Sequence, residues 1–121
     1  MDMDKERIAK IAQSKAYVMG HIDPRTGLEQ LSEELNEMSQ AALKLIRAAG
    51  WNGNPTPVNY KQALSDLNEE FCDVLMCLEV LTENGADDLY QCVENATISP
   101  KWIRWANRIK ESDCNAESCD S

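Results

Sequence analysis

The chain has 121 residues and a formal net charge of −9, with 21 Asp plus Glu against 12 Lys plus Arg. This length suits one domain with its own core. The acidic balance disfavours nucleic acid polymers and anionic membranes as partners, because like charges repel, but it permits a small anionic ligand that metal ions neutralise locally. Five cysteines, no signal-peptide pattern and no apolar run of membrane-spanning length predict a reduced, cytoplasmic protein.

Helix-breaking residues and hydrophobic periodicity divide the chain into helices and loops. No segment shows the strict alternation that is typical of a strand. Loops are expected where Gly, Pro and Asn gather, as in "GWNGNPTPVN". The predicted helices cover residues 3–17, 28–49, 60–83, 86–95 and 101–112, and the two longest predicted loops cover 18–27 and 50–59.

Helix-start and helix-stop signals accompany these bounds. Thr26 followed by Glu29 has the spacing of a capping box and predicts the start of the second helix. Gly50 is typical of a left-handed residue that ends a helix. Ser99 followed by Pro100, a cap and then a first helical residue, predicts the start of the last helix.

Each of the two long helices carries an apolar stripe with helical spacing. Packing of the stripes predicts an all-α fold, an antiparallel helical bundle built on two long helices and completed by oligomerisation. We expect one domain over residues 1–112, followed by a polar, disordered tail over residues 113–121. The stripes are Leu28, Leu31, Leu35, Met38, Ala42, Leu45, Ile46 and Ala49, and Leu64, Leu67, Phe71, Val74, Leu75, Leu78 and Leu81.

Acidic residues border both apolar stripes. Glu34 and Glu37 lie on the border of the first stripe, and Glu70 and Asp73 on the border of the second. Each pair is spaced i, i+3, so its two members project from the same side. If the stripes pack face to face, the four carboxylates converge and need a counter-charge to stay ionised. A hard divalent cation such as Mg²⁺ would supply that charge, while an ordinary solvated acidic face is the alternative interpretation.

The acidic residues belong to two motifs, "EELNE" at residues 33–37 and "EFCD" at residues 70–73. Their type, order and helical placement resemble the MazG-like branch of the all-α nucleoside triphosphate pyrophosphohydrolases, which carries EExxE on one helix and ExxD on the next. The resemblance spans residues 28–108. It implies a Mg²⁺-dependent enzyme, with Mn²⁺ as a substitute, that cleaves a nucleoside triphosphate between the α and β phosphates and forms a homodimer or homotetramer.

The resemblance also implies roles for individual acidic residues. Glu34, Glu37, Glu70 and Asp73 match the Mg²⁺ ligands of the family. Glu33 matches an adjacent acid that binds in the outer shell or acts as a base toward the attacking water. The products would be the nucleoside monophosphate and pyrophosphate.

Basic and aromatic residues supply candidates for substrate binding. Lys101 and Arg104, in "KWIRW", resemble a late-helix Lys and Arg of the family and are expected to bind phosphate. Lys44 lies two turns beyond Glu37 and is a further candidate for the triphosphate tail. An ordinary solvated basic face remains the alternative for these cations. Trp51 is the candidate for stacking on the base.

The chain departs from the family pattern at three points. The loop 50–59 makes the spacer between the motifs longer than usual, and it could cover the site or alter oligomer packing. Val80 stands in the region where an Asn is frequent, and Trp105 replaces a second Arg. Trp102 and Trp105 are interpreted as core residues in preference to base-stacking ones. His21, in the predicted loop 18–27, is interpreted as incidental, although this loop could contact the nucleotide.

Other metal-binding folds fit less well. A ferritin-like di-iron site needs histidines on the long helices, which carry none. An EF-hand needs closely spaced oxygen ligands with a central Gly in one loop, which is absent. Structural zinc is disfavoured because two cysteines, Cys72 and Cys77, lie on a predicted helix and two more, Cys114 and Cys119, lie in the tail without partners. The main alternative is a non-catalytic helical protein for nucleotide sensing or protein interaction, against which the intact acidic motifs argue.

Overall fold

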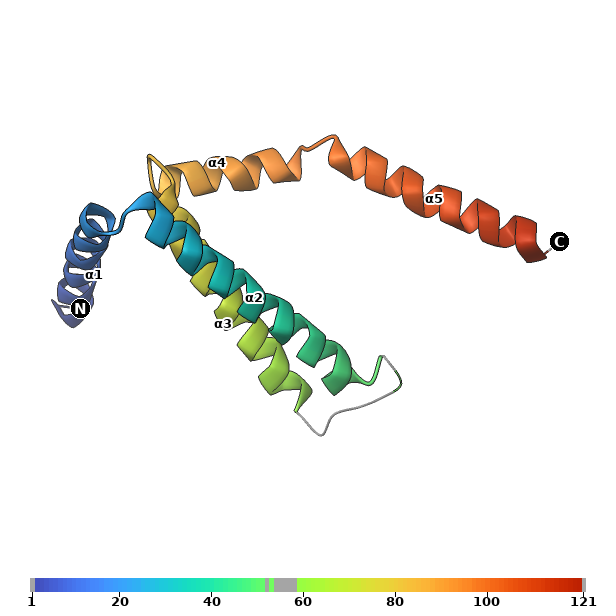
Figure 1. Ribbon diagram of the computed structural model, residues 1–121, viewed down its shortest axis with the longest axis horizontal. Helices are drawn as coiled ribbons and strands as arrows, with labels where there is room; N and C mark the ends of the chain where they lie inside the picture. Colours follow the sequence, from blue (N-terminus) through green and yellow to red (C-terminus); the bar gives the residue numbers. More distant parts are fainter. Residues whose placement is uncertain (1, 52, 54–58, 121) are drawn as a thin grey trace. The chain divides into compact units, whose positions relative to one another are not determined.

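The computed structural model describes the backbone of residues 2–51, 53 and 59–120 and the side chains of residues 4–51, 53 and 59–115 (Figure 1). No strand occurs in this part of the chain, so the predicted all-α class is confirmed. Most of the loop 50–59, with any role in covering the site, lies outside the described residues. The helices are α1 (Asp2–His21), α2 (Pro24–Ala49), α3 (Tyr60–Leu81), α4 (Ala86–Thr97) and α5 (Lys101–Asp120).

The chain forms two compact units, Met1–Leu89 and Tyr90–Ser121. In the first unit, α2 and α3 lie side by side and run antiparallel, as Figure 1 shows. This hairpin confirms the pairing of the two long helices. Completion of the bundle by oligomerisation and the division into a domain over residues 1–112 and a tail over 113–121 stay predictions.

The hairpin core is small. Its buried apolar side chains are Ala41, Ala63 and Val74, and Ala63 is 0% exposed. Small side chains permit a close approach of two helix backbones, because no larger group keeps them apart. Gly27 works in the same way, since a Cβ there would lie 2.8 Å from Leu81 Cδ2.

The link between the first two helices is shorter than the sequence predicts. Helix α1 continues past Tyr17 to His21, whose ring stacks on Tyr17 at 3.9 Å and whose Nδ1 lies 2.7 Å from the Tyr17 carbonyl oxygen. Gly20 does not end the helix. The predicted loop 18–27 is therefore wrong, and His21 belongs to a helix.

Helix α2 begins before the predicted residue because Asp23 is its N-cap. The Asp23 carboxylate accepts a hydrogen bond from Thr26 N at 2.8 Å, and Pro24 occupies the first turn, where its fixed φ suits a helix. That backbone hydrogen bond lowers the pKa of Asp23. The capping box predicted for Thr26 and Glu29 is wrong, since Thr26 donates to the cap instead of being it.

The other helix ends follow their signals more closely. Gly50 adopts φ 74° and donates to Arg47 O, which confirms the predicted stop. Asn59 caps α3 by accepting from Lys61 N at 2.8 Å. Ser99 Oγ accepts from Lys101 N at 3.2 Å, as predicted for the start of α5.

The second unit consists of most of α4 and all of α5. Helix α5 continues to Asp120, beyond its predicted end at residue 112, because no Gly or Pro interrupts it. Trp102 and Trp105 stack at 5.7 Å and are 56% and 58% exposed. The interpretation of these two rings as core is therefore wrong. Trp102 Nε1 donates to Ala96 O at 2.7 Å, which joins the start of α5 to the end of α4.

Two further features bear on the environment of the protein. Among the described residues, no helix combines the length and the apolar character that a membrane crossing requires. Cys72, Cys77, Cys92 and Cys114 are free thiols.

Candidate metal site between the two long helices

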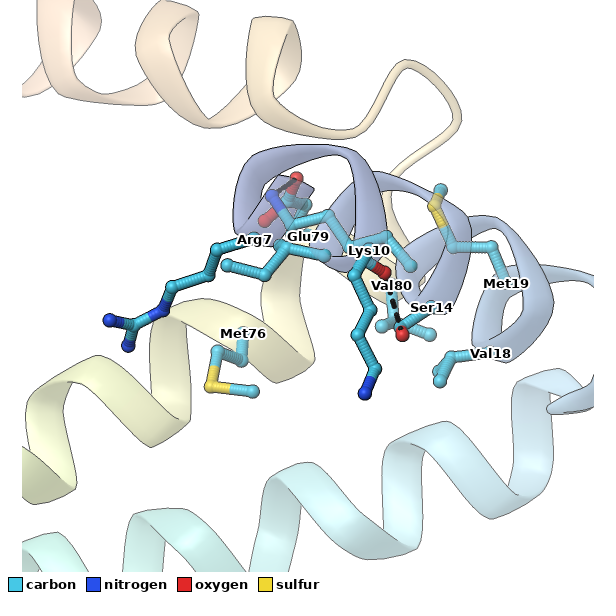
Figure 2. A pocket seen from close by; sticks show the side chains of 10 residues that line it. Arg7, Lys10, Ser14, Val18, Met19, Met76, Glu79 and Val80 are labelled. Carbon is cyan, nitrogen blue, oxygen red and sulfur yellow. Dashed lines mark hydrogen bonds and ion pairs between the residues drawn. The ribbon is translucent and has the colours of Figure 1, made fainter. Parts of the chain in front are cut away.

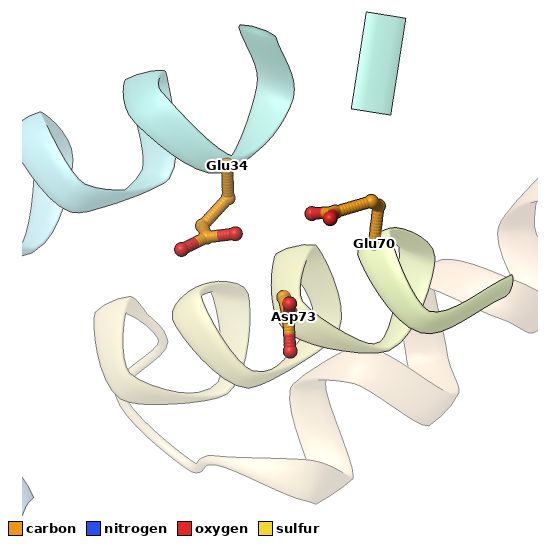
Figure 3. Close-up of side chains that lie close together, drawn as sticks. All are labelled: Glu34, Glu70 and Asp73. Carbon is orange, nitrogen blue, oxygen red and sulfur yellow. The ribbon is translucent and has the colours of Figure 1, made fainter. Parts of the chain in front are cut away.

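Three carboxylates meet across the hairpin, as Figure 3 shows. Glu34 projects from α2, while Glu70 and Asp73 project from α3 and reach the same place because their i, i+3 spacing puts them on one side. One oxygen from each residue lies within 4.8 Å of the other two. The predicted convergence of the two acidic motifs is present for these three residues.

Two carboxylate oxygens of these residues lack partners. Glu34 Oε2 and Glu70 Oε2 are buried and accept no hydrogen bond. A buried oxygen without a partner costs stability because it has lost its water. The other oxygen of Glu34 accepts from Gln30 Nε2 at 2.9 Å, which orients the carboxylate and leaves Oε2 without a partner. Hard carboxylate oxygens with spare lone pairs are the donor set that Mg²⁺ prefers, so these residues fit the ion that the sequence predicts.

The electrostatics of the cluster centre on Glu70. Burial raises the pKa of Glu70 above its ordinary value, and Glu37 raises it further through its charge and a hydrogen bond. The charges of Asp73 and Glu34 act in the same direction. Because the hydrogen bond favours the protonated form, protonated Glu70 donates to Glu37. Glu37 thus belongs to the cluster electrostatically, although it lies outside the close group of three.

Cys77 lies one turn beyond Asp73 on α3 and is affected by the same negative charges. Burial raises the pKa of the Cys77 thiol, and the charges of Glu34 and Asp73 raise it as well. The thiol therefore stays protonated at neutral pH. A neutral thiol is a poor ligand for a hard cation, which leaves the oxygens as the donors.

We expect the substitution Glu70→Gln to stabilise the metal-free protein most at neutral pH. The pKa of Glu70 is raised in the folded state, so protonation favours folding below the unfolded pKa, and this stabilisation is lost as the pH rises through the folded pKa. Glutamine resembles the protonated acid. The difference in Tm between variant and wild type, measured in EDTA, should therefore shrink as the pH falls from about 8 to about 4.

The difference in Tm between the variant and the wild type cancels the contributions of groups that titrate in both proteins. The pKa values of Asp23 and Asp88 are lowered, each mainly by a backbone hydrogen bond, so these groups change stability with the opposite sign. Both proteins retain them. A Tm difference that stays constant over the whole range would contradict the raised pKa of Glu70.

Glu33, Lys44 and Trp51 are the other predicted site residues of the first unit, and none belongs to the close group of three carboxylates. Glu33 is exposed on α2. Lys44 lies with Glu37 in one hollow, and its Nζ pairs with Asp66 Oδ2 at 3.6 Å. Trp51 is 69% exposed and meets Tyr60 edge to face at 6.4 Å. Base stacking by Trp51 and phosphate binding by Lys44 stay predictions.

The predicted phosphate-binding pair of the last helix belongs to the other unit. Lys101 and Arg104 are both exposed in the first turn of α5. Their i, i+3 spacing places them on one helix face, as the sequence suggests. Their role in phosphate binding stays a prediction.

Two residues near the cluster are not predicted from the sequence. Gln30 orients Glu34, and Asp66 pairs with Lys44. The i, i+4 spacing of Gln30 and Glu34 is a signal that identifies such a bond within one helix. The Asp66–Lys44 pair joins two helices, so no local spacing in the sequence reveals it.

A separate groove lies between α1 and α3 (Figure 2). Its volume is about 380 Å³, and apolar side chains such as Ile11 and Met76 form most of its wall. Lys15 Nζ pairs with Glu79 Oε1 at 3.0 Å on its rim and ties the two helices together. None of the three clustered carboxylates lines this groove, so it is distinct from the candidate metal site.

No protein-family model, curated protein or solved structure matches the chain. The likeness to the MazG-like pyrophosphohydrolases is therefore carried by the motifs "EELNE" and "EFCD" and by their helical placement.

Proposed function

We propose that the protein is a Mg²⁺-dependent pyrophosphohydrolase of the MazG-like kind, which cleaves a nucleoside triphosphate between the α and β phosphates. The observation that carries this proposal is the meeting of Glu34, Glu70 and Asp73, with two buried oxygens that lack partners. Such a cluster suits a divalent cation shared with substrate phosphates. The EExxE and ExxD pattern supplies the reaction type.

Each acidic residue has a distinct task in this proposal. Glu34, Glu70 and Asp73 would hold the ion, with Glu37 beside them. When bound, Mg²⁺ supplies charge neutralisation at the phosphates and acidifies water. Glu33 is exposed on the same helix, and it would orient or deprotonate the attacking water.

The basic residues would act on the phosphates. Lys44 would release Asp66 and bind an oxygen of the departing pyrophosphate, which exchanges one half-exposed ion pair for another. Phosphate binding by Lys101 and Arg104, which belong to the other unit, stays a prediction of the resemblance.

The exposed apolar surface of the hairpin supports a homodimer or homotetramer. Leu28, Leu35 and Phe71 are 57%, 49% and 48% exposed, although all three belong to the predicted apolar stripes. Large exposed apolar groups that gather on helices are typical of surfaces that another chain covers. A second copy packed on the hairpin would complete the bundle.

The test of the proposed function is release of pyrophosphate from a panel of canonical dNTPs, dUTP, NTPs and damaged nucleotides. We expect release from one or a few of them with Mg²⁺ and none with EDTA, because the carboxylates cannot bind phosphate without a cation between them. Mn²⁺ should replace Mg²⁺ in part.

A silent panel would contradict the catalytic proposal. If the folded protein bound Mg²⁺ and nucleotide, seen as a rise in Tm, but released no pyrophosphate, the nucleotide-sensing or interaction role would be favoured. A folded protein whose Tm did not respond to Mg²⁺ would contradict the metal site as well.

A further inference from the structure

Two hollows of different chemistry border the clustered carboxylates along the hairpin. The first, here the apolar hollow, has a volume of about 220 Å³ and is lined by Glu34 and Asp73 at one end. The second, here the polar hollow, has a volume of about 280 Å³ and is lined by Glu37 and Glu70. The cluster thus contributes one acid from each helix to each hollow.

The order of residues places the hollows on opposite sides of the cluster. On α2, the apolar hollow takes residues that precede Glu37, and the polar hollow takes Glu37 and later residues. On the antiparallel α3 the order is reversed, with Glu70 in the polar hollow and Asp73 in the apolar one. Both helices therefore place the apolar hollow toward the start of α2 and the end of α3, and the polar hollow toward the opposite end of the hairpin.

The apolar hollow suits an uncharged ring. Apart from the two acids, its wall consists mainly of apolar or weakly polar groups, among them Ile22, Met76 and Val80. The side-chain amide of Gln30 also lines it but already donates to Glu34. Pockets that hold a whole drug-sized ligand have volumes of about 300–1,000 Å³. The apolar hollow is smaller, so it holds one end of a ligand.

The polar hollow is acidic, so it suits a phosphate only when Mg²⁺ lies between the phosphate and the acids. Lys44 is the cation in its wall, and the acids Asp66 and Glu69 line it too. Helical side chains lean toward the N-terminus of their helix, so the Lys44 stem leans back toward Glu37. A phosphate held there would take Lys44 from Asp66, its ion-pair partner at 3.6 Å.

We propose that the ligand of this site binds along the hairpin, with its base in the apolar hollow and its outer phosphates in the polar hollow beside Lys44. This inference rests on the proposed function for the identity of the ligand, a nucleoside triphosphate. The base is selected by size and by its apolar faces against Met76 and Val80. Trp51 lines neither hollow, so the base contact predicted for it is replaced by these two side chains.

The experiment compares ligands that have both a base and a triphosphate with a ligand that has only the phosphates. The first are the α,β-methylene analogues of dUTP and dATP, in which a carbon replaces the oxygen that bridges the α and β phosphates and so prevents cleavage there. The second is inorganic tripolyphosphate, which has no base. Binding of each is measured calorimetrically with Mg²⁺ to the wild type and to the variants Val80→Phe and Lys44→Ala.

We expect Val80→Phe to weaken the tighter-binding analogue about tenfold or more, because the larger side chain fills the apolar hollow. Its effect on tripolyphosphate should stay within about twofold. Lys44→Ala should weaken all the ligands that bind. Leu43→Phe is the matched control, since Leu43 is 54% exposed on α2 and lines neither hollow.

Two results would overturn the orientation. One is that Val80→Phe, folded by circular dichroism, binds the analogues as tightly as the wild type does. The other is that it weakens tripolyphosphate as much as the analogues. If the wild type binds the analogues but releases no pyrophosphate from any natural nucleotide, the proposed catalysis fails and the same binding comparison still decides the orientation. A wild type that binds none of the three ligands with Mg²⁺ overturns both proposals.

Discussion

Glu70→Gln is expected to lower Mg²⁺-dependent pyrophosphate release by more than about 100-fold, because even outer-shell changes at metal sites cost about 10- to 100-fold. The reason is local. Glu70 contributes one carboxylate oxygen to the cluster with Glu34 and Asp73, and its Oε2 is buried without a partner, so the substitution removes one of three carboxylate ligands. The same variant should lose the rise in Tm that Mg²⁺ gives the wild type.

The stability of Glu70→Gln in EDTA shows whether a loss of activity comes from the metal site or from unfolding of the protein. Burial and the neighbouring acids raise the pKa of Glu70, so ionised Glu70 destabilises the metal-free protein at neutral pH. Glu70→Gln should therefore be at least as stable as the wild type in EDTA while being inactive with Mg²⁺. A variant that is both inactive and less stable in EDTA would mean that Glu70 supports the fold instead.

The matched control removes a carboxylate elsewhere. Glu83 is exposed in the turn after α3 and does not belong to the cluster of three. Glu83→Gln should leave both the pyrophosphate release and the Mg²⁺-induced rise in Tm unchanged. Near-normal activity of Glu70→Gln beside this control would contradict the assignment of the site.

The sequence predicts the part of the site that lies within single helices. Glu34, Glu70 and Asp73 were identifiable because helical spacing fixes which residues share a face, and because apolar stripes show which faces meet. Glu37 has the same spacing, but it lies one turn further along α2 and faces Glu70 without joining the close group. The difference depends on the register between the two helices, which no local spacing encodes.

The same limit applies to the ends of the elements. Gly50 and Ser99 act through their own backbone or side chain, so the local pattern was sufficient. The capping signal at Thr26 is misleading because Asp23, three residues earlier, is the better cap and Pro24 follows it. Competition between two nearby signals decides such cases, and the stronger cap extends α2 at its start.

Burial was harder to predict than secondary structure. Trp102 and Trp105 have the spacing of a core stripe, yet they stack on each other and stay exposed. A periodic stripe shows that a helix has an apolar face, but it does not say what covers that face. In this chain much apolar surface of the hairpin also remains exposed, and the proposed oligomer would cover it.

Ala63→Leu is expected to destabilise the protein by about 1–3 kcal/mol, the usual cost of forcing extra carbons into a packed site. Ala63 is 0% exposed and lies two turns before Glu70 on α3. The added side chain must push α2 and α3 apart or distort them. Because the carboxylates of Glu34 and Glu70 face each other across the same gap, the variant should also gain less Tm from Mg²⁺ than the wild type does.

Two companion variants separate packing from helix propensity, with urea unfolding in EDTA as the measurement. Ser65→Leu places the same side chain at an exposed position of α3 and should change stability by no more than about 0.5 kcal/mol. Ala63→Gly creates no clash and should cost about 1–2 kcal/mol through helix propensity and the loss of one buried methyl group, with the gain from Mg²⁺ retained. If Ala63→Leu were as stable as Ser65→Leu, the two helices would not approach closely at Ala63. If its gain from Mg²⁺ were undiminished, the separation of the helices at Ala63 would not control the carboxylate cluster.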